Sequence, residues 1–151
     1  MIYDILIESP NHGGPRAFTH GVIIHGTRGG ADYGREFDAT LNWFSNPVSE
    51  VSAHAVIRHD GWIACCVDES LSAWHAGIHN RAWLGIELEK PRLGDAISEA
   101  QYHTLARWCL VMSTRFGFPL RGGLWGNATL IEHKDTPQVI GSVKSDVGDP
   151  F

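Results

Sequence analysis

Short apolar runs alternate along this chain with two longer segments of helical periodicity. The runs cover residues 2–7, 22–25, 52–58, 62–67 and 84–88, and we predict a strand at each because each is too short for a helix. Asp60 and Gly61 separate the third run from the fourth. They predict a two-residue turn between antiparallel strands, because both residue types tolerate positive φ angles. The glycine-rich segment 11–15 is expected to be a turn.

The two segments of helical periodicity begin at residues 32 and 98. In the first, apolar side chains recur every three or four residues until Pro47 stops the helix, which predicts an amphipathic helix over 32–44. In the second, Ser98 and Gln101 have the spacing of a capping box. Apolar residues continue there at helical intervals as far as Gly117, so the longest helix is expected over 98–116.

Strands and helices therefore alternate irregularly, with an antiparallel hairpin in the middle of the chain. This order predicts an α/β fold in which a central mixed β-sheet carries helices packed on its faces. At 151 residues, one domain buries about two-thirds of its unfolded surface, and the sequence contains no internal repeat or low-complexity linker. We expect a single domain over residues 1–151.

Charge and hydropathy argue against several classes of partner. The net charge of −5 and the lack of clustered Lys and Arg argue against nucleic acid, whose phosphates bind clustered cations. The sequence has no run of about 18 apolar residues, and its first ten residues lack the basic flank and apolar core of a secretory signal. We expect a monomer without nucleic-acid or membrane partners.

We also expect reduced, buried cysteines at Cys65, Cys66 and Cys109.

Two of the nine histidines stand where an α/β fold opens its cleft. His25 ends the run 22–25, and His133 lies in the polar segment 132–135, so both are expected near a sheet edge. A lone histidine is more often a surface or core residue, and this spacing alone does not establish a metal site. The sequence has no His-Glu-x-x-His, Cys-x-x-Cys, Gly-x-Ser-x-Gly or phosphate-binding glycine motif.

Five segments resemble, in the same order, those of the type 2 amidase family. That family includes phage amidases, peptidoglycan-recycling amidases and animal peptidoglycan recognition proteins. The segments are VIIHGT at 22–27, VSAHAVI at 51–57 with Asp60 and Gly61 after it, AWHAG at 73–77, LGIELE at 84–89, and EHKD at 132–135 with KSDVG at 144–148. The resemblance covers nearly the whole chain. It implies an N-acetylmuramoyl-L-alanine amidase, which hydrolyses the amide bond between N-acetylmuramic acid and L-alanine in peptidoglycan or muropeptides.

The same resemblance implies a Zn²⁺ cofactor bound by His25, His133 and Asp146, with water in the fourth position. Glu87 matches the family's general base, and Lys144 matches the cation that stabilises the oxyanion. Two imidazoles and one carboxylate suit such a site, because they leave a coordination position where water loses a proton near neutral pH.

Alternatives remain at several of these positions. Glu89 is predicted on the same strand face as Glu87, so either could be the acid, with Glu87 favoured. Asp135 competes with Asp146 as a ligand, although a supporting position beside His133 is favoured. The chain also departs from the family pattern after Asp146, where Val147 replaces a common proline, and the stretch from 133 to 144 is slightly longer than usual.

His54, Trp74 and His75 match family positions that line the cleft, where they could contact sugar or peptide. Packing beneath the sheet is an equally good interpretation of these three residues. Large aromatics supply buried area anywhere in a domain, so the other tryptophans are assigned to the core or its rim: Trp43, Trp62, Trp83, Trp108 and Trp125.

Two other functions fit part of the pattern. The segment 133–135 has the His-x-Asp form of non-haem iron oxygenases, but no later histidine completes that triad. A non-catalytic peptidoglycan-binding module is the second rival, and the presence of Lys144 and Asp146 favours catalysis over it.

The preferred biological role is a phage or prophage endolysin that leaves the host cytoplasm through a holin. A cytoplasmic recycling amidase is the alternative, and a wall-binding domain could belong to a longer protein.

Overall fold

The computed structural model describes residues 2–123, 126–133 and 136. Within them lie two α-helices, α1 (Arg35–Ser45) and α2 (Glu99–Phe116), and two short 3₁₀ helices, η1 (Pro47–Ser49) and η2 (Gly77–Arg81). The strands are β1 (Ile5–Leu6), β2 (His12–Pro15), β3 (Gly21–Gly26), β4 (Ala55–Ile57), β5 (Ile63–Cys65), β6 (Leu71–Ala73), β7 (Trp83–Leu88) and β8 (Leu130–Glu132). Among these described residues, no helix is both long enough and apolar enough to cross a membrane.

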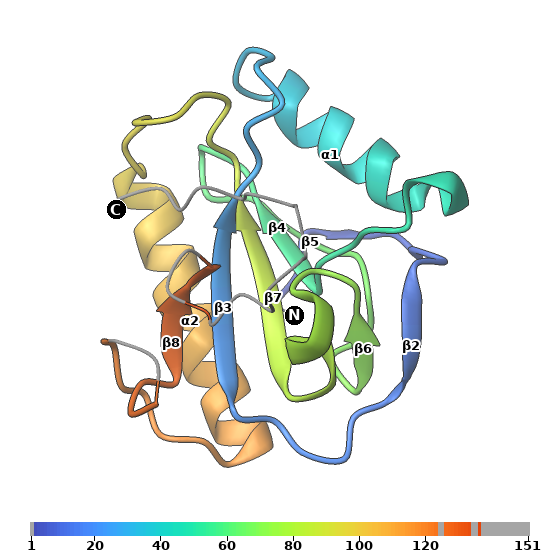
Figure 1. Cartoon of the computed structure of the whole chain (residues 1–151). Coiled ribbons are helices and arrows are strands. Elements are labelled where there is room, and N and C mark those ends of the chain that lie inside the picture. The colour runs from blue at the N-terminus through green and yellow to red at the C-terminus, as the bar shows by residue number, and fades with distance from the viewer. Residues whose placement is uncertain (1, 124–125, 134–135, 137–151) are drawn as a thin grey trace.

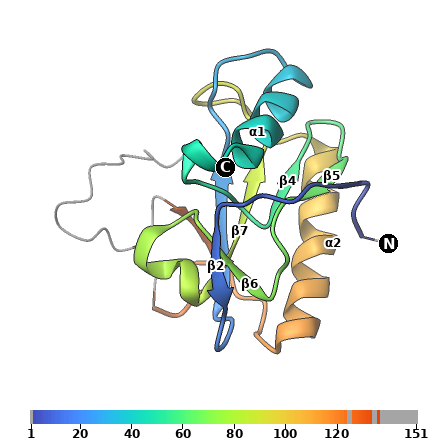
Figure 2. The same ribbon diagram turned by 90° about the vertical axis from the view of Figure 1, so that its right-hand side faces the viewer.

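Six of the described strands form one mixed sheet in the order β1-β5-β4-β7-β3-β8 (Figure 1). The pair β4 and β5 is antiparallel, whereas the other neighbours in this sheet run parallel. Strands β2 and β6 form a separate antiparallel pair. Figure 2 shows α2 on one side of the large sheet and α1 with η2 on the other. The predicted α/β class, with a central mixed sheet and helices on both faces, is therefore confirmed.

The face of the sheet under α2 is an apolar core. Leu84, Ile86 and Leu88 alternate along β7 and pack in one cluster with Trp108 and Met112 of α2. All five side chains are fully buried. Because a buried side chain of this kind contributes about 1.5–3 kcal/mol, this interface fixes the position of β7 against the helix.

The predicted capping signals set the bounds of α2. The Ser98 hydroxyl accepts the N–H of Gln101 at 3.0 Å, and the Gln101 side chain accepts the N–H of Ser98 at 3.1 Å. At the other end, Gly117 adopts a φ of 73°, a left-handed conformation that favours glycine. The capping box and the glycine stop are therefore confirmed.

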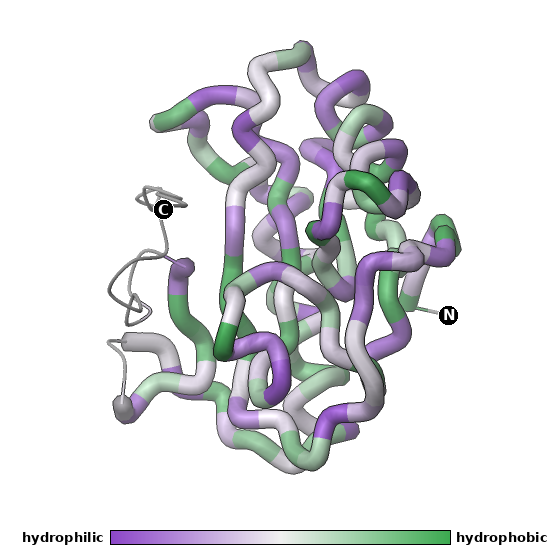
Figure 3. Tube along the Cα trace, turned by 45° about the vertical axis from the view of Figure 1, so that its right-hand side comes forward, coloured by the Kyte–Doolittle hydropathy of each residue, from purple (hydrophilic) through white to green (hydrophobic). Residues whose placement is uncertain are grey.

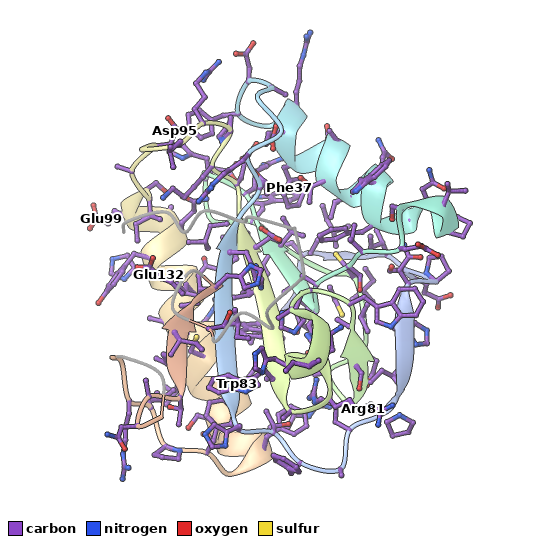
Figure 4. The ribbon with its side chains drawn as sticks, viewed as in Figure 1. Phe37, Arg81, Trp83, Asp95, Glu99 and Glu132 are labelled. Atoms are coloured by element: carbon purple, nitrogen blue, oxygen red, sulfur yellow. The ribbon has the colours of Figure 1, made fainter. Side chains whose placement is uncertain are left out.

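Helix α1 covers part of the opposite face. Phe37, Leu41 and Phe44 pack against Val56 of β4, and Phe37 points from the helix toward the sheet in Figure 4. Hydrophobic and hydrophilic residues alternate along its turns (Figure 3), so its predicted amphipathic character is confirmed. The helix begins at Arg35 rather than at residue 32. Tyr33, an apolar residue within the predicted range 32–44, precedes the helix and is exposed, so the predicted start of the helix is wrong.

The hairpin between β4 and β5 is antiparallel, as predicted, but its loop is one residue longer than expected. The N–H of Arg58 donates to the carbonyl of Trp62, which leaves His59, Asp60 and Gly61 as the loop. Gly61 has a φ of 92°, the conformation that follows a tight turn in a three-residue hairpin loop. The predicted two-residue turn is therefore wrong.

Several short strands also differ from the sequence predictions. Strand β2 occupies residues expected to form a turn, and it pairs with β6 through a register shift between Gly13 and Pro15. Neither β6 nor β8 was predicted, because three residues are too few to display an alternating pattern. Strand β1 contains only two residues of the run 2–7. Whether these short strands form therefore depends on pairing with a strand distant in sequence, rather than on the local pattern of side chains.

The cysteines and tryptophans largely follow their predictions. All three cysteines are free; Cys66 and Cys109 are buried, and Cys65 is partly buried. Burial raises the pKa of Cys109 to about 12, which keeps its thiol protonated at neutral pH. Of the tryptophans assigned to core or rim, Trp83 and Trp108 are buried, whereas Trp43 and Trp62 are half exposed. Trp125 lies outside the described residues.

Candidate active site

Three of the predicted site residues lie in one row across the sheet. His25 is near the end of β3 and is in register with Glu87 of β7. Ile24 is in register with Glu132 of β8, so the following residue, His133, lies beside His25, and their ring centroids are 4.5 Å apart. The row stands at the carboxyl ends of three adjacent parallel strands, which is where α/β sheets bind ligands.

His25 is buried among other imidazoles. Burial lowers the pKa of His25 well below its ordinary value, and the rings of His75 and His133 lower it further. The neutral imidazole is the form that binds a metal ion. His25 is therefore in the ligand-competent form at neutral pH.

His75 precedes η2 and packs against β7. A Cβ atom added at Gly85 would lie 2.4 Å from Cγ of His75, so the strand accommodates this ring only because residue 85 is glycine. Nε2 of His75 is 3.1 Å from the carbonyl oxygen of Trp83, and its Nδ1 is 3.1 Å from Nε2 of His25. Burial lowers the pKa of His75 to about 3, so this ring is also neutral. Trp83 begins β7, at the lower end of the sheet in Figure 4.

His54 lies deeper, on the other side of His75. It is fully buried, its Nδ1 accepts the N–H of Gly85 at 2.9 Å, and its Nε2 is 3.0 Å from the carbonyl of Leu71. This burial favours the packing interpretation of His54 over a direct substrate contact. Trp74 is 37% exposed, so its surface is available to a ligand.

Glu87 and Glu89 differ in their partners. The carboxylate of Glu89 is fully buried and accepts the N–H groups of Phe37 at 3.0 Å, His59 at 2.8 Å and Gly34. It therefore ties the start of α1 and the hairpin loop to the sheet. Glu87 is partly buried and stands beside His25 in the row. These contacts favour Glu87 over Glu89 as the acid–base residue.

The remaining predicted site residues are Asp135, Lys144 and Asp146, and all three lie outside the described residues. Within the described part, no three His, Cys, Asp or Glu side chains form a group that could hold a metal ion. The two adjacent imidazoles of His25 and His133 supply nitrogen donors of the kind that zinc prefers. Those two donors fit a zinc site that a further ligand would complete.

Sequence reasoning missed two contributors to this arrangement, Gly85 and the backbone of Trp83. A glycine inside the apolar run 84–88 was the available signal, because glycine in a strand often marks a close approach of another group. A backbone carbonyl carries no side-chain signal, so the hydrogen bond from His75 to Trp83 is apparent only in the structure.

Comparison with known proteins places this chain in a family. The profile of the N-acetylmuramoyl-L-alanine amidase family matches residues 15–149, which is most of the chain. The chain therefore belongs to the N-acetylmuramoyl-L-alanine amidase family. N-acetylmuramoyl-L-alanine amidase A of Achromobacter lyticus is 39% identical over 81 residues, which are 53% of this chain and 42% of that protein. The match thus spans less than half of the relative's length.

Solved structures share the fold over nearly the full chain. A selenomethionine derivative of AmpD has a TM-score of 0.73 at 25% identity, over 97% of this chain and 88% of that chain. A mutant endolysin from Bacillus subtilis has a TM-score of 0.62 at 22% identity, over 85% of this chain and 83% of that chain. The second likeness concerns the fold alone.

Proposed function

We propose that this protein is a zinc-dependent hydrolase of the amide bond between N-acetylmuramic acid and L-alanine in peptidoglycan. The observation that carries this proposal is the row of His133, His25 and Glu87 on adjacent strand ends, in a chain of the N-acetylmuramoyl-L-alanine amidase family. Two neighbouring imidazoles suit a metal site, and a carboxylate beside them suits the general base of metal-assisted amide hydrolysis.

In this proposal His25, His133 and Asp146 hold the metal ion. The support for the two histidines is the 4.5 Å distance between their ring centroids and the neutral state of His25. Asp146 is included as the third ligand because the segment 144–148 resembles the corresponding family segment. A bound Zn²⁺ would supply a Lewis acid that polarises the carbonyl and activates water near neutral pH.

Glu87 has the proposed role of general base. Its register with His25 supports this role, because a carboxylate beside that ligand would take a proton from the attacking water and return one to the leaving nitrogen. Lys144 is proposed to stabilise the negative charge on the carbonyl oxygen. Exposed Trp74 is proposed to contact the sugar or peptide of the substrate.

The proposed role is that of an endolysin, which acts on the intact cell wall. The alternative, a recycling amidase, would act on soluble muropeptides, and a peptidoglycan-binding module would release no product. The amidase chemistry is supported by the relative named amidase A, while the AmpD and endolysin structures support the shared fold. Substrate preference separates the two enzymatic roles.

Incubation of the protein with purified sacculi, and separately with soluble muropeptides, tests this proposal. Mass spectrometry should find free peptide stems that begin with L-alanine, and elemental analysis should find about one zinc per chain. Removing zinc with a chelator, or making the His25→Ala variant, should abolish release of these stems. A zinc-free protein whose activity survives the chelator would contradict the proposal. A preference for soluble muropeptides would contradict the endolysin role alone.

A further inference from the structure

Two hydrogen bonds of the His75 ring link the backbone of Trp83 to the ring of His25. Nε2 of His75 lies 3.1 Å from the carbonyl oxygen of Trp83, and Nδ1 lies 3.1 Å from Nε2 of His25. The ring is held against Gly85, where no other residue type leaves space for it. Its two nitrogens therefore face fixed partners.

Only one arrangement of protons satisfies both hydrogen bonds when the rings are neutral. A carbonyl oxygen only accepts, so Nε2 of His75 carries the proton and donates it to Trp83. Nδ1 of His75 then has a lone pair and accepts, so Nε2 of His25 carries the donated proton. A neutral imidazole has one N–H, which leaves the lone pair of His25 on Nδ1.

We propose that His75 is a positioning residue that fixes the tautomer of His25 and thereby presents Nδ1 of His25 to the metal ion. Metal-binding histidines usually donate their second ring N–H to an acceptor that orients the ring, and here the acceptor is another imidazole anchored by the Trp83 carbonyl. This inference rests on the zinc role proposed for His25.

The same contacts argue against His75 as a substrate contact. Both of its nitrogens already face protein atoms, and its backbone N–H donates to Oδ1 of Asn80 at 3.1 Å. No ring nitrogen is left for a sugar hydroxyl or a peptide group. The side chain therefore acts through His25 rather than on the substrate.

Nuclear magnetic resonance of the metal-free wild-type protein tests the proton arrangement directly. Long-range ¹H–¹⁵N correlation spectra, assigned by single histidine substitutions, should show protonated Nε2 and unprotonated Nδ1 in both His25 and His75. A spectrum with the proton on Nδ1 of His25 would overturn the proposal. This measurement depends on neither zinc nor activity.

Variants at position 75 test the consequence for metal binding. His75→Phe keeps a flat ring but removes the acceptor, so competition with a chromophoric chelator should show about 10- to 100-fold weaker zinc binding. His75→Asn restores an acceptor near the position of Nδ1 and should recover part of that loss. His103→Phe makes the same change at an exposed histidine on α2, across the sheet, and should leave zinc affinity unchanged.

These outcomes separate the positioning role from the proposed function. A folded His75→Phe protein with wild-type zinc affinity and a raised KM would overturn the positioning role and make His75 a substrate contact. Wild-type protein that binds no zinc would overturn the proposed function, and the positioning role with it. If His75→Phe does not fold, the wild-type spectrum and the His75→Asn titration still decide the question.

Discussion

The two faces of the central sheet are built from the same strands but differ in chemistry along β7. On the face toward α2, Leu84, Ile86 and Leu88 of β7 are packed in an apolar core. On the other face, the alternate residue Glu87 stands in a row with His25 and His133. Strand alternation therefore places an apolar core and an ionisable site one residue apart.

This difference shows how the protein holds buried imidazoles in place. Burying an ionisable imidazole costs free energy, so other parts of the fold must supply the stability that keeps these rings in place. Apolar packing on the α2 face supplies it. On the site face, apolar packing is confined to the cluster under α1, and polar contacts hold the ionisable residues. Glu89 accepts backbone N–H groups, while His54 and His75 share hydrogen bonds with the backbone of β7. The α2 face should thus contribute to stability alone, whereas the site face should contribute to activity through Glu87 and to stability through Glu89.

The sharpest test of this comparison contrasts the two glutamates. Glu87→Ala should lower kcat by about a hundred- to ten-thousand-fold, with zinc content unchanged, because only the proton transfer is removed. Glu89→Ala should instead lower the free energy of unfolding by roughly 3 kcal/mol, because buried N–H groups lose their acceptor. Steady-state kinetics and urea denaturation of both variants give these values. If Glu89→Ala shows the large loss of kcat in a stable protein, the acid–base assignment is wrong.

The apolar face is tested by Trp108→Ala. The fully buried Trp108 side chain packs between α2 and the sheet, so its removal should lower the free energy of unfolding by about 3–5 kcal/mol. Activity per folded molecule should change little. Leu110→Ala, on the exposed side of the same helix, is the control and should change stability by no more than about 0.5 kcal/mol. A stable Trp108→Ala protein that loses its activity would contradict the division between the two faces.

The smallest effect concerns pH and the fully buried His54. Burial holds the pKa of His54 well below its ordinary value, with smaller effects from His75 and Arg16, so the unfolded chain takes up a proton near pH 6.5 and the folded protein does not. Stability from this group is therefore present above pH 6.5 and falls as the pH is lowered, by up to about 1.4 kcal/mol per pH unit. Denaturation between pH 7 and 5.5, with a chelator present, should show a shallower pH dependence for His54→Asn than for wild type.

The control for this pH series is His103→Asn. The ring of His103 is exposed on α2, so its loss should leave the pH dependence of stability as in wild type. Equal slopes for wild type and His54→Asn would show that His54 does not contribute to acid sensitivity.

Local patterns predicted those elements whose signals lie within a few residues. The capping box at Ser98 and Gln101, the apolar face of α1 and the antiparallel hairpin at Gly61 were all correct in kind. The loop length at Gly61 and the strand β2 were not, because each depends on which backbone groups pair across the fold. A three-residue strand such as β8 has too few side chains to display a period at all.

The sequence by itself determined the α/β class and the family, and it identified His25, His133 and Glu87 as site candidates. The tertiary structure decided which hydrogen-bond partner each polar side chain has. Glu89 accepts the N–H of Gly34, 55 positions away, and His25 bonds to His75, 50 positions away. Periodicity and capping are properties of neighbouring residues, whereas a hydrogen-bond partner is chosen by how distant segments meet. That is why only the structure shows that Glu89, of the two glutamates predicted on one strand face, is bonded to the start of α1.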